Sequence, residues 1–547
     1  MSQWTRRGMM LLAGAALAAE TAGDLRPALA QPSDGGKGSK SAKLADLTLT
    51  EASAAIQGGS ATSTDLVKAL LDRINTLNPK VNCYITVMGA EALAQAAALD
   101  AEFKAGHIRG PLHGIPIGLK DNIDTAGVRT TAASPMFRDR VPSEDAEIVR
   151  RLKAAGAVMI GKLNLHEFAF GCTGDVSYFG PTRNPWSLAH VTGGSSSGSG
   201  ASVAARMAYG ALGTDTGGSI RVPSAWCGIV GLKPTIGLVS IRGIIPCAAS
   251  LDHCGPMART VEDAALMLGS MTGYDELDIF SVPSKSEDYV ASMKQPVKGF
   301  RLSAPASFYD HIDAEIEPVV MAAVKHLSEL TAGITSRAPL WDGDPGGAPG
   351  DAEFYHHDLI QKYGFDYMPP NRAWLSRIDN PPAGGKVATA ADDARAHQRL
   401  MTTRRMIDGV FKDFDLVVVP TTRMAAPKIN DSLKREMMDT RGPLGRATKV
   451  YDFFAEDSGC TNTHPFDSYG IPAISVPCGF TASGLPVGIM IAGPHFAEGK
   501  VLALAYAYQQ STSWHSRAPA LSADMPVPPI VEKADAAEDA KKKNAAA

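Results

Sequence analysis

The chain has 547 residues, of which 45% are hydrophobic and 20% charged, so it can bury a large core. A formal net charge of −4 offers no basic surface for a polyanion, which argues against nucleic acid as a partner. The seven cysteines form no Cys-x-x-Cys pair and the histidines no cluster at metal-ligand spacing, so neither a metal, an organic cofactor nor a disulfide framework is implied.

The first thirty residues have the pattern of an export signal. Arg6 and Arg7 precede an uncharged, mostly apolar run over residues 8–19, and Ala28-Leu29-Ala30 is a small-x-small cleavage site before Gln31. The paired arginines and the short Ala/Gly-rich run favour the twin-arginine type. The alternative is an uncleaved tail with a chance arginine pair. We expect a mature chain that begins near Gln31 and lies in the periplasm or is otherwise exported.

Composition sets the limits of the folded part. Residues 31–43 are rich in Gly, Ser and Lys without periodicity, which is typical of a flexible linker. Residues 524–547 hold Pro, Ala and a Lys run with almost no large apolar side chain, so we expect a disordered tail. One large domain is expected over residues 44–523. No segment after the signal reaches the roughly 18 apolar residues that a membrane span needs.

Helical and strand patterns alternate through this domain. Apolar residues at helical spacing predict helices over residues 66–77, 146–155 and 315–330. Short apolar runs predict strands at residues 115–119, 157–160, 416–419, 473–476 and 487–491. Such alternation is typical of βαβ units, so we predict an α/β fold with a mainly parallel mixed sheet covered by helices on both faces. Residues 300–450 are expected to form a helical insertion that caps the substrate.

Two Gly/Ser clusters flank an Ala-rich helical segment between Gly193 and Ser219. Glycines allow sharp bends and can point consecutive N–H groups at one spot, as an oxyanion hole requires. A flexible linker is the plain alternative, but apolar residues follow directly from Ile220 to Val230. No Lys follows either cluster, which excludes a phosphate loop. Asp215-Thr216-Gly217 and Asp457-Ser458-Gly459 match aspartic protease signatures by letter only, because the chain is rich in helices.

A second serine-enzyme pattern overlaps the first cluster. Residues 194–198 (GSSSG) match Gly-x-Ser-x-Gly, which would make Ser196 the nucleophile of an α/β-hydrolase esterase. That site needs a strong hydrophobic strand just before the serine, and residues 187–192 (SLAHVT) form a poor one. The esterase alternative stays open at this point.

Three stretches resemble the amidase signature family closely: residues 193–200 (GGSSSGSG), 213–221 (GTDTGGSIR) and 227–235 (CGIVGLKPT). The resemblance extends to residues 114–122 (GIPIGLKDN), 179–186 (FGPTRNPW) and 470–477 (GIPAISVP). It spans about residues 44–515, with 300–450 least similar. Ser197 stands where relatives commonly have Gly, but the 24-residue spacing from Ser195 to Ser219 is kept, so the frame is intact.

The resemblance implies a hydroxyl relay. Ser219 is the implied nucleophile, Ser195 the intermediary hydroxyl in an unusual cis peptide, and Lys120 the base. A serine needs a base to become nucleophilic, and a free lysine is protonated at neutral pH, so Lys120 must be neutral. Burial without a carboxylate partner would lower its pKa enough. Without the resemblance, Lys120 would instead be taken as a surface lysine paired with Asp121.

The resemblance also implies supporting groups around the relay. The backbone N–H groups of Thr216, Gly217, Gly218 and Ser219 would form the oxyanion hole. Asp215 and Arg221 would hold the nucleophile loop as a pair. The acyl pocket would be bordered by Gly171, Cys172 and Thr173.

The implied activity is hydrolysis of a carboxylic amide to an acid plus an amine or ammonia, with ester or carbamate cleavage as a side activity. The expected partner is a small amide substrate, and a homodimer is one open assembly. The glutaminase-type subunit of a tRNA-dependent amidotransferase is the alternative within the family, since it uses the same three residues. That subunit is cytosolic and usually reads Asn-Leu-Ala-Gly where residues 467–470 here read DSYG.

Overall fold

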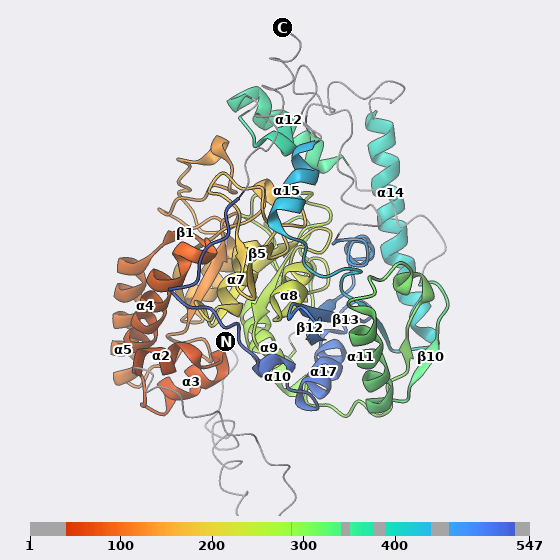
Figure 1. The fold of residues 1–547 in the computed structure, drawn as a ribbon, viewed down its shortest axis with the longest axis horizontal. Helices are drawn as coiled ribbons and strands as arrows, with labels where there is room; N and C mark the ends of the chain where they lie inside the picture. Colours follow the sequence, from red (N-terminus) through yellow and green to blue (C-terminus); the bar gives the residue numbers. More distant parts are fainter. Residues whose placement is uncertain are drawn as a thin grey trace, which may run out of the picture. The chain divides into compact units, whose positions relative to one another are not determined.

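The computed structural model describes residues 40–285, 287–340, 350–364, 366–372, 375, 389–438 and 459–530. An 11-stranded sheet runs through this part in the order β1-β3-β2-β6-β8-β7-β12-β13-β11-β9-β10 (Figure 1). Its strands are β1 (Tyr84–Val87), β2 (Pro116–Lys120), β3 (Val158–Leu163), β6 (Gly210–Asp215), β7 (Val230–Lys233), β8 (His253–Ala258), β9 (Leu302–Ser303), β10 (Ile334–Ser336), β11 (Leu416–Pro420), β12 (Ala473–Phe480) and β13 (Pro486–Ala492). A separate ribbon pairs β4 (Arg183–Asn184) with β5 (Ser187–Val191).

The α/β class, the single domain and the mixed sheet are confirmed, but the balance of strand directions differs from the prediction. Among the described strands of the main sheet, six pairs are antiparallel and four are parallel. The turn between β12 and β13 is too short for a crossover, so this pair must be antiparallel. "Mainly parallel" was therefore wrong, because apolar runs alone do not reveal how strands are connected.

Helices lie against the sheet in groups. The bounds are α2 (Lys40–Asp46), α3 (Leu49–Gln57), α4 (Ser63–Val81), α5 (Gly89–Lys104), α6 (Glu147–Ala154), α7 (Ser197–Ala204), α8 (Arg221–Cys227), α9 (Val261–Met271), α10 (Tyr289–Ser292), α11 (Glu317–Leu330), α12 (Asp351–Tyr363), α14 (Ala390–Met406), α15 (Ile429–Met438), α16 (Pro465–Tyr469) and α17 (Glu498–Gln510). Figure 1 shows α2 to α5 beside β1, whereas α9, α10, α11 and α17 form a second group.

Local sequence explains where the helices begin and end. In α4, the Thr62 side chain accepts the Asp65 N–H and the Asp65 side chain accepts the Thr62 N–H, which satisfies two otherwise unpaired donors. Asn82 ends the helix in the left-handed conformation at φ 56°. The helices predicted at 66–77, 146–155 and 315–330 correspond to α4, α6 and α11.

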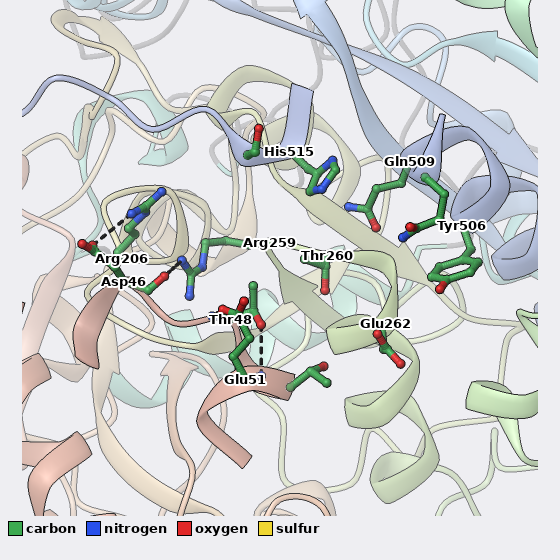
Figure 2. Close-up of a pocket in the computed structure, with 13 residues that line it drawn as sticks. Asp46, Thr48, Glu51, Arg206, Arg259, Thr260, Glu262, Tyr506, Gln509 and His515 are labelled. Carbon is green, nitrogen blue, oxygen red and sulfur yellow. Dashed lines mark hydrogen bonds and ion pairs between the residues drawn. The ribbon is translucent and has the colours of Figure 1, made fainter. Parts of the chain in front are cut away.

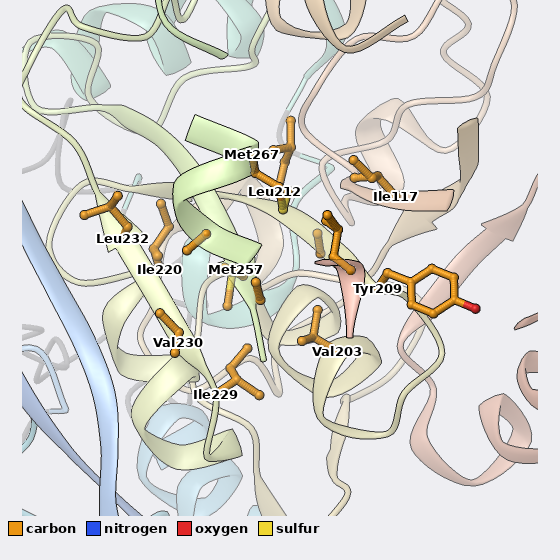
Figure 3. Packing of buried hydrophobic residues seen from close by; sticks show 14 of the residues in the cluster. Ile117, Val203, Tyr209, Leu212, Ile220, Ile229, Val230, Leu232, Met257 and Met267 are labelled. Atoms are coloured by element: carbon orange, nitrogen blue, oxygen red, sulfur yellow. The ribbon is translucent and has the colours of Figure 1, made fainter. Parts of the chain in front are cut away.

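The main hydrophobic core lies between the central strands and α9 (Figure 3). Ile117 of β2, Leu212 of β6, Leu232 of β7 and Met257 of β8 are fully buried, and Met267 of α9 packs into the same cluster. Burying one such side chain contributes about 1.5–3 kcal/mol. The ends of β2 and β6 are thereby attached to the most rigid part of the molecule.

Two parallel neighbours bring the predicted site residues together. β2 pairs with β6 in the register Ile117↔Gly210 and Leu119↔Leu212. The carboxyl ends of parallel neighbours meet at one edge of the sheet, so Lys120 and Asp215 end their strands at that edge. The serine loops lie at helix starts, with Ser195 just before α7 and Ser219 just before α8.

The region expected to be a helical insertion also contributes to the sheet. It holds α11, α12, α14 and α15, but β9, β10 and β11 extend the main sheet at its edge. β9 and β10 contain two and three residues, too few for a periodic signal. Residues 341–349, 376–388 and 439–458 lie outside the described residues, and so do Asp457 and Ser458.

The limits of the domain differ slightly from those expected. Helix α2 begins at Lys40, inside the predicted linker. Residues 524–530 are described without helix or strand, and Ile530 packs beside a buried cluster that includes Trp226. Residues 1–39 and 531–547, which hold the export pattern and the rest of the tail, lie outside the described residues. No helix in the described ranges is long and apolar enough to cross a membrane.

Candidate active site

Lys120 ends β2 inside the protein. Its Nζ donates to Ser195 Oγ at 2.7 Å and to Thr214 Oγ1 at 2.7 Å, and the side chain is fully buried. Burial lowers the pKa of Lys120 to about 7, because its hydrogen-bond partners are hydroxyls and no carboxylate is paired with it. A large share of this lysine is neutral at neutral pH, as a base requires.

The Ser195 loop is held by close backbone contacts. The Gly194-Ser195 peptide bond is cis. Gly194 N donates to Cys172 O at 2.8 Å, and His166 N donates to Ser195 O at 3.0 Å. A Cβ on Gly194 would lie 2.7 Å from Gly174 N, so only glycine fits here. The Gly/Ser cluster is therefore a packed loop and not a linker.

Ser219 lies next to this loop. It is 5% exposed, and its carbonyl oxygen accepts the Ser196 N–H at 3.2 Å. Within the described residues, no hydrogen bond joins Ser195 Oγ to Ser219 Oγ. The structure thus forms the contact between Lys120 and Ser195 and leaves the one between Ser195 and Ser219 open, as is common before substrate binds.

One predicted oxyanion donor is already used. The Gly218 N–H is donated to Asp215 Oδ1 in a short hydrogen bond, so in this state it does not point at an oxyanion. Thr216 and Gly217 are half-buried, and in the described part of the chain their N–H groups and that of Ser219 have no hydrogen-bond partner. The available donor set therefore narrows to three.

Thr463 shapes the nucleophile loop from a distant part of the sequence. Its Oγ1 donates to Gly217 O at 2.6 Å. Gly218 has φ +134°, and a Cβ there would lie 2.0 Å from Thr463 Oγ1. Any larger residue at 218 would have to displace this contact.

Asp215 and Arg221 form the expected pair. Arg221 Nε and Nη2 donate to the two oxygens of Asp215 at 2.9 and 3.0 Å, and Ile220 N adds a bond at 3.1 Å. Burial alone would raise the pKa of Asp215, but the Arg221 guanidinium outweighs it and holds the pKa well below its usual range. The pair fixes both ends of the loop that carries Ser219.

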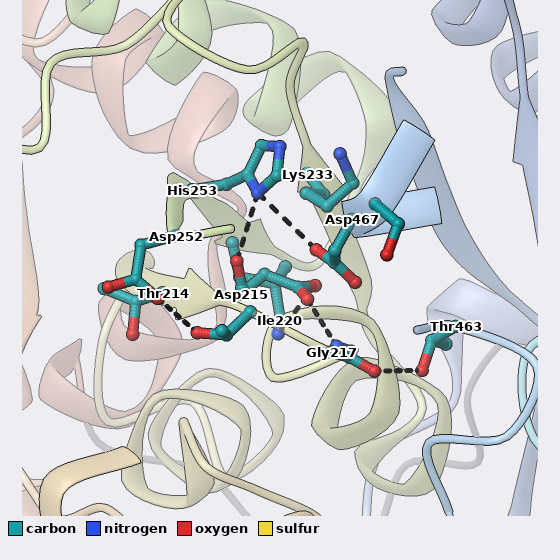
Figure 4. Close-up of polar contacts among 12 residues, drawn as sticks. Thr214, Asp215, Gly217, Ile220, Lys233, Asp252, His253, Thr463 and Asp467 are labelled. Atoms are coloured by element: carbon teal, nitrogen blue, oxygen red, sulfur yellow. Dashed lines mark hydrogen bonds and ion pairs between the residues drawn. The ribbon is translucent and has the colours of Figure 1, made fainter. Parts of the chain in front are cut away.

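The sequence analysis missed the other members of this buried network. Asp467 accepts Arg221 Nη2 at 2.6 Å, although the two residues are far apart in the chain. His253 Nδ1 lies 3.2 Å from Asp215 O and 3.5 Å from Asp467 Oδ1, and Figure 4 shows these three side chains gathered together. Burial raises the pKa of Asp467 and lowers that of His253. These groups surround Arg221 on the side away from the serines.

A second buried lysine lies near this network. Lys233 Nζ donates to Ile471 O at 2.7 Å, and burial lowers the pKa of Lys233 to about 7. Both signals were present in the sequence, since Lys233 lies in the third signature stretch and Asp467 in the departure at 467–470. Neither residue type reveals its partner without the fold.

Ser196 occupies a structural position. It is fully buried, its Oγ donates to Thr214 O at 3.2 Å, and the same oxygen accepts Thr214 N–H at 3.2 Å. The strand before it, β5, belongs to the small ribbon and not to the main sheet. The geometry therefore does not support the esterase alternative.

The predicted pocket residues contribute mainly through their backbone. Cys172 is 1% exposed in a cluster with Cys460, and Thr173 Oγ1 donates to Asp175 Oδ1 at 2.6 Å. Gly171 is half-buried, and a Cβ there would collide with the His166 ring at 2.2 Å. These residues shape the wall that packs on the Ser195 loop. No group of three metal-binding side chains occurs in the described ranges.

The geometry agrees with a family comparison. The family model Amidase matches residues 65–339 and 373–502. The chain belongs to the amidase signature family. Two similar relatives are both the same kind of glutamyl-tRNA(Gln) amidotransferase subunit. The one from Moorella thermoacetica is 37% identical over 87% of this chain and 98% of that protein, and the one from Roseiflexus sp. strain RS-1 is 39% identical over 88% and 99%.

A solved structure of 6-aminohexanoate cyclic dimer hydrolase, complexed with substrate, is also similar to this member of the amidase signature family. It is 25% identical, covers 87% of this chain and 99% of its own, and has a TM-score of 0.76. The family and its fold are thus established, while the relatives differ in what they act on.

Proposed function

We propose that the chain hydrolyses a carboxylic amide through an acyl-enzyme on Ser219. The proposal is carried by one observation: a buried Lys120 bonded to Ser195 Oγ at 2.7 Å, with a pKa near 7 and no carboxylate partner. A lysine in that state is a base at neutral pH. The conformation of the neighbouring loops supports Ser219 as the group that reacts.

The proposed reaction has two halves. Ser219 Oγ attacks the amide carbon while its proton passes through Ser195 to Lys120. The N–H groups of Thr216, Gly217 and Ser219 stabilise the oxyanion, and the amine leaves with the proton returned by the relay. Water then attacks the ester on Ser219 by the same route and releases the acid. Ser195 must rotate or move slightly to reach Ser219.

A serine-reactive fluorophosphonate probe tests the nucleophile. Ser219→Ala should abolish covalent labelling, whereas Ser196→Ala should keep it. Lys120→Ala should lower the rate about 10²-fold or more, the usual loss of a general base. An adduct mapped by mass spectrometry to Ser196 would contradict the proposal.

Similarity favours the side-chain amide of glutamine as substrate, with the chain as the glutaminase-type subunit of an amidotransferase. The two relatives that are glutamyl-tRNA(Gln) amidotransferase subunits match at 37% and 39% identity over nearly their full length. Such a subunit would work beside partner chains.

A second candidate is a small amide other than glutamine. It is favoured by the DSYG stretch at residues 467–470, where Asp467 binds Arg221 behind the nucleophile loop. The similar hydrolase of a cyclic dimer adds support. Ammonia release from L-glutamine and arylamine release from an aryl amide by the purified chain separate the two. A preference for glutamine of about tenfold or more in kcat/KM supports the first candidate, and the reverse preference supports the second.

A further inference from the structure

A cavity lies at the opposite edge of the sheet from the serines. Its volume is about 410 Å³, within the range of roughly 300–1,000 Å³ found for small-molecule sites. The strand β8 pairs His253 with Asp215 at the site edge and Ala258 with Gly210 at the other edge. Arg259 follows β8, so it lies roughly 20 Å from His253 along the extended strand. The cavity is separate from the site described above.

The cavity is built from α2, α3, α9, α17 and their flanking residues (Figure 2). Its lining is mainly polar. The residues are Asp46, Thr48, Thr50, Glu51, Arg206, Arg259, Thr260, Glu262, Tyr506, Gln509, Gln510, His515 and Ser516.

Arg259 presents an unused pair of donors in this lining. The residue is only 8% exposed, and its Nη1 donates to Asp46 O at 2.8 Å, which fixes the guanidinium. Its Nε and Nη2 have no hydrogen-bond partner among the described residues. These two atoms form one edge of the planar group, the edge that binds two oxygens of a carboxylate or phosphate side by side. Leaving both unpaired in a buried position is costly, so the edge is suited to a ligand.

Two further buried nitrogens line the same cavity. Gln509 is 5% exposed, and its Oε1 accepts the Val261 N–H at 2.9 Å, which orients the amide and leaves Nε2 as the free donor. Gln509 Nε2 and His515 Nδ1 have no partner in the described part of the chain. A histidine nitrogen donates in one of its tautomers. The unused capacity of the lining therefore consists largely of donors.

The carboxylates of the lining already have partners. Asp46 pairs with Arg73 at 2.8 Å and with Arg206 at 3.0 Å. Glu51 accepts the Thr48 N–H at 2.8 Å in a capping box, and Glu262 lies 3.7 Å from Lys294 Nζ. None of them neutralises the free edge of Arg259.

We propose that this cavity binds a small organic oxyanion, a carboxylate or a phosphate, on the Nε and Nη2 edge of Arg259. Gln509 Nε2 donates a further hydrogen bond to the same group or to an adjacent oxygen. The cavity is larger than the oxyanion alone requires, so the rest of the ligand lies against Tyr506 and the neighbouring lining. The site is independent of the proposed amide hydrolysis.

Isothermal titration calorimetry of the full chain tests the proposal, in a buffer free of other oxyanions and at constant ionic strength. Inorganic phosphate is one titrant and acetate the other. The expected result is saturable binding of one equivalent of at least one titrant. Binding of phosphate alone, acetate alone or both identifies the oxyanion. A chain that binds neither titrant overturns the proposal.

Variants then locate the binding. Gln509→Glu keeps the acceptor for Val261 N–H but replaces the free donor with a carboxylate oxygen beside Arg259, so the affinity should fall about tenfold or more. Arg259→Lys keeps the charge but loses the two-donor edge and should weaken binding similarly. Arg206→Lys, in the same lining but already paired with Asp46, is the control and should stay within a factor of about three.

Melting temperatures measured without titrant show whether each variant folds. Wild-type affinity in Gln509→Glu, or an equal loss in Arg206→Lys, would overturn the assignment. If both Gln509 and Arg259 variants fail to fold, the wild-type titration still decides, because saturable one-site binding supports the proposal and its absence refutes it.

Discussion

Replacing Thr214 by valine should lower the pKa of Lys120. Thr214 Oγ1 accepts Lys120 Nζ at 2.7 Å, and an acceptor stabilises the charged ammonium more than the neutral amine. Valine has nearly the same shape and suits the strand β6, so the fold should survive. Asn122, which also donates to Thr214 Oγ1, keeps its second bond to Ile245 O at 3.1 Å.

The size of the effect follows from the energies involved. A lysine pKa near 7 means that the folded protein disfavours the ammonium form by about 5 kcal/mol relative to water. Losing one hydrogen bond to a charged group, compared with one to a neutral group, costs about 1 kcal/mol more. That difference corresponds to roughly one pH unit. The rate requires neutral Lys120, so it falls as pH drops through this pKa, and the midpoint should move to lower pH in Thr214→Val.

The assay is kcat/KM for an amide substrate between about pH 5 and pH 9. Below its midpoint the rate should fall about tenfold per pH unit. Lys233→Met is the matched control, because Lys233 is equally buried and its pKa is also about 7. It should leave the midpoint unchanged. An unmoved or raised midpoint in Thr214→Val, or a limb that vanishes in Lys233→Met, would refute Lys120 as the base.

Three further outcomes are expected. Arg221→Met should lower the free energy of unfolding by about 3–5 kcal/mol in urea titrations, because Asp215 loses its buried counter-charge; a loss below about 1 kcal/mol would contradict the role of the pair. Dialysis against a strong chelator should leave the rate unchanged, and a loss restored by zinc would show that the reaction class is wrong. Changing Arg6 and Arg7 to Lys should retain the chain in the cytosol on fractionation; an unchanged distribution would remove the export hypothesis.

Sequence patterns predicted the strongly periodic and motif-bearing parts of the molecule. The helix α4 and the strand β2 came from apolar spacing alone, and Lys120 was recognised because it lies in the stretch GIPIGLKDN, which resembles the family. Family resemblance, not composition, then linked Lys120 to Ser195. The hydrogen bond between these two side chains spans 75 residues of sequence.

The remaining features had no local signal. The partner of Arg221 at Asp467 lies 246 residues away, and such pairing depends on the packing of α16 against the nucleophile loop. The use of the Gly218 N–H by Asp215 depends on backbone geometry and not on residue type. Strands of two or three residues, such as β9 and β10, carry too few side chains to show a period.

The pairing of β2 with β6 ties the chemistry to strand alignment. Side chains alternate between the two faces of a strand, so sliding β2 by a single residue would turn Lys120 to the opposite side of the sheet, away from Ser195. A one-residue insertion or deletion in this strand would therefore silence the enzyme without removing any reactive group. The segment at 300–450 is under no such constraint toward Lys120, so its length and composition can change and alter which amides are accepted while the base stays in place.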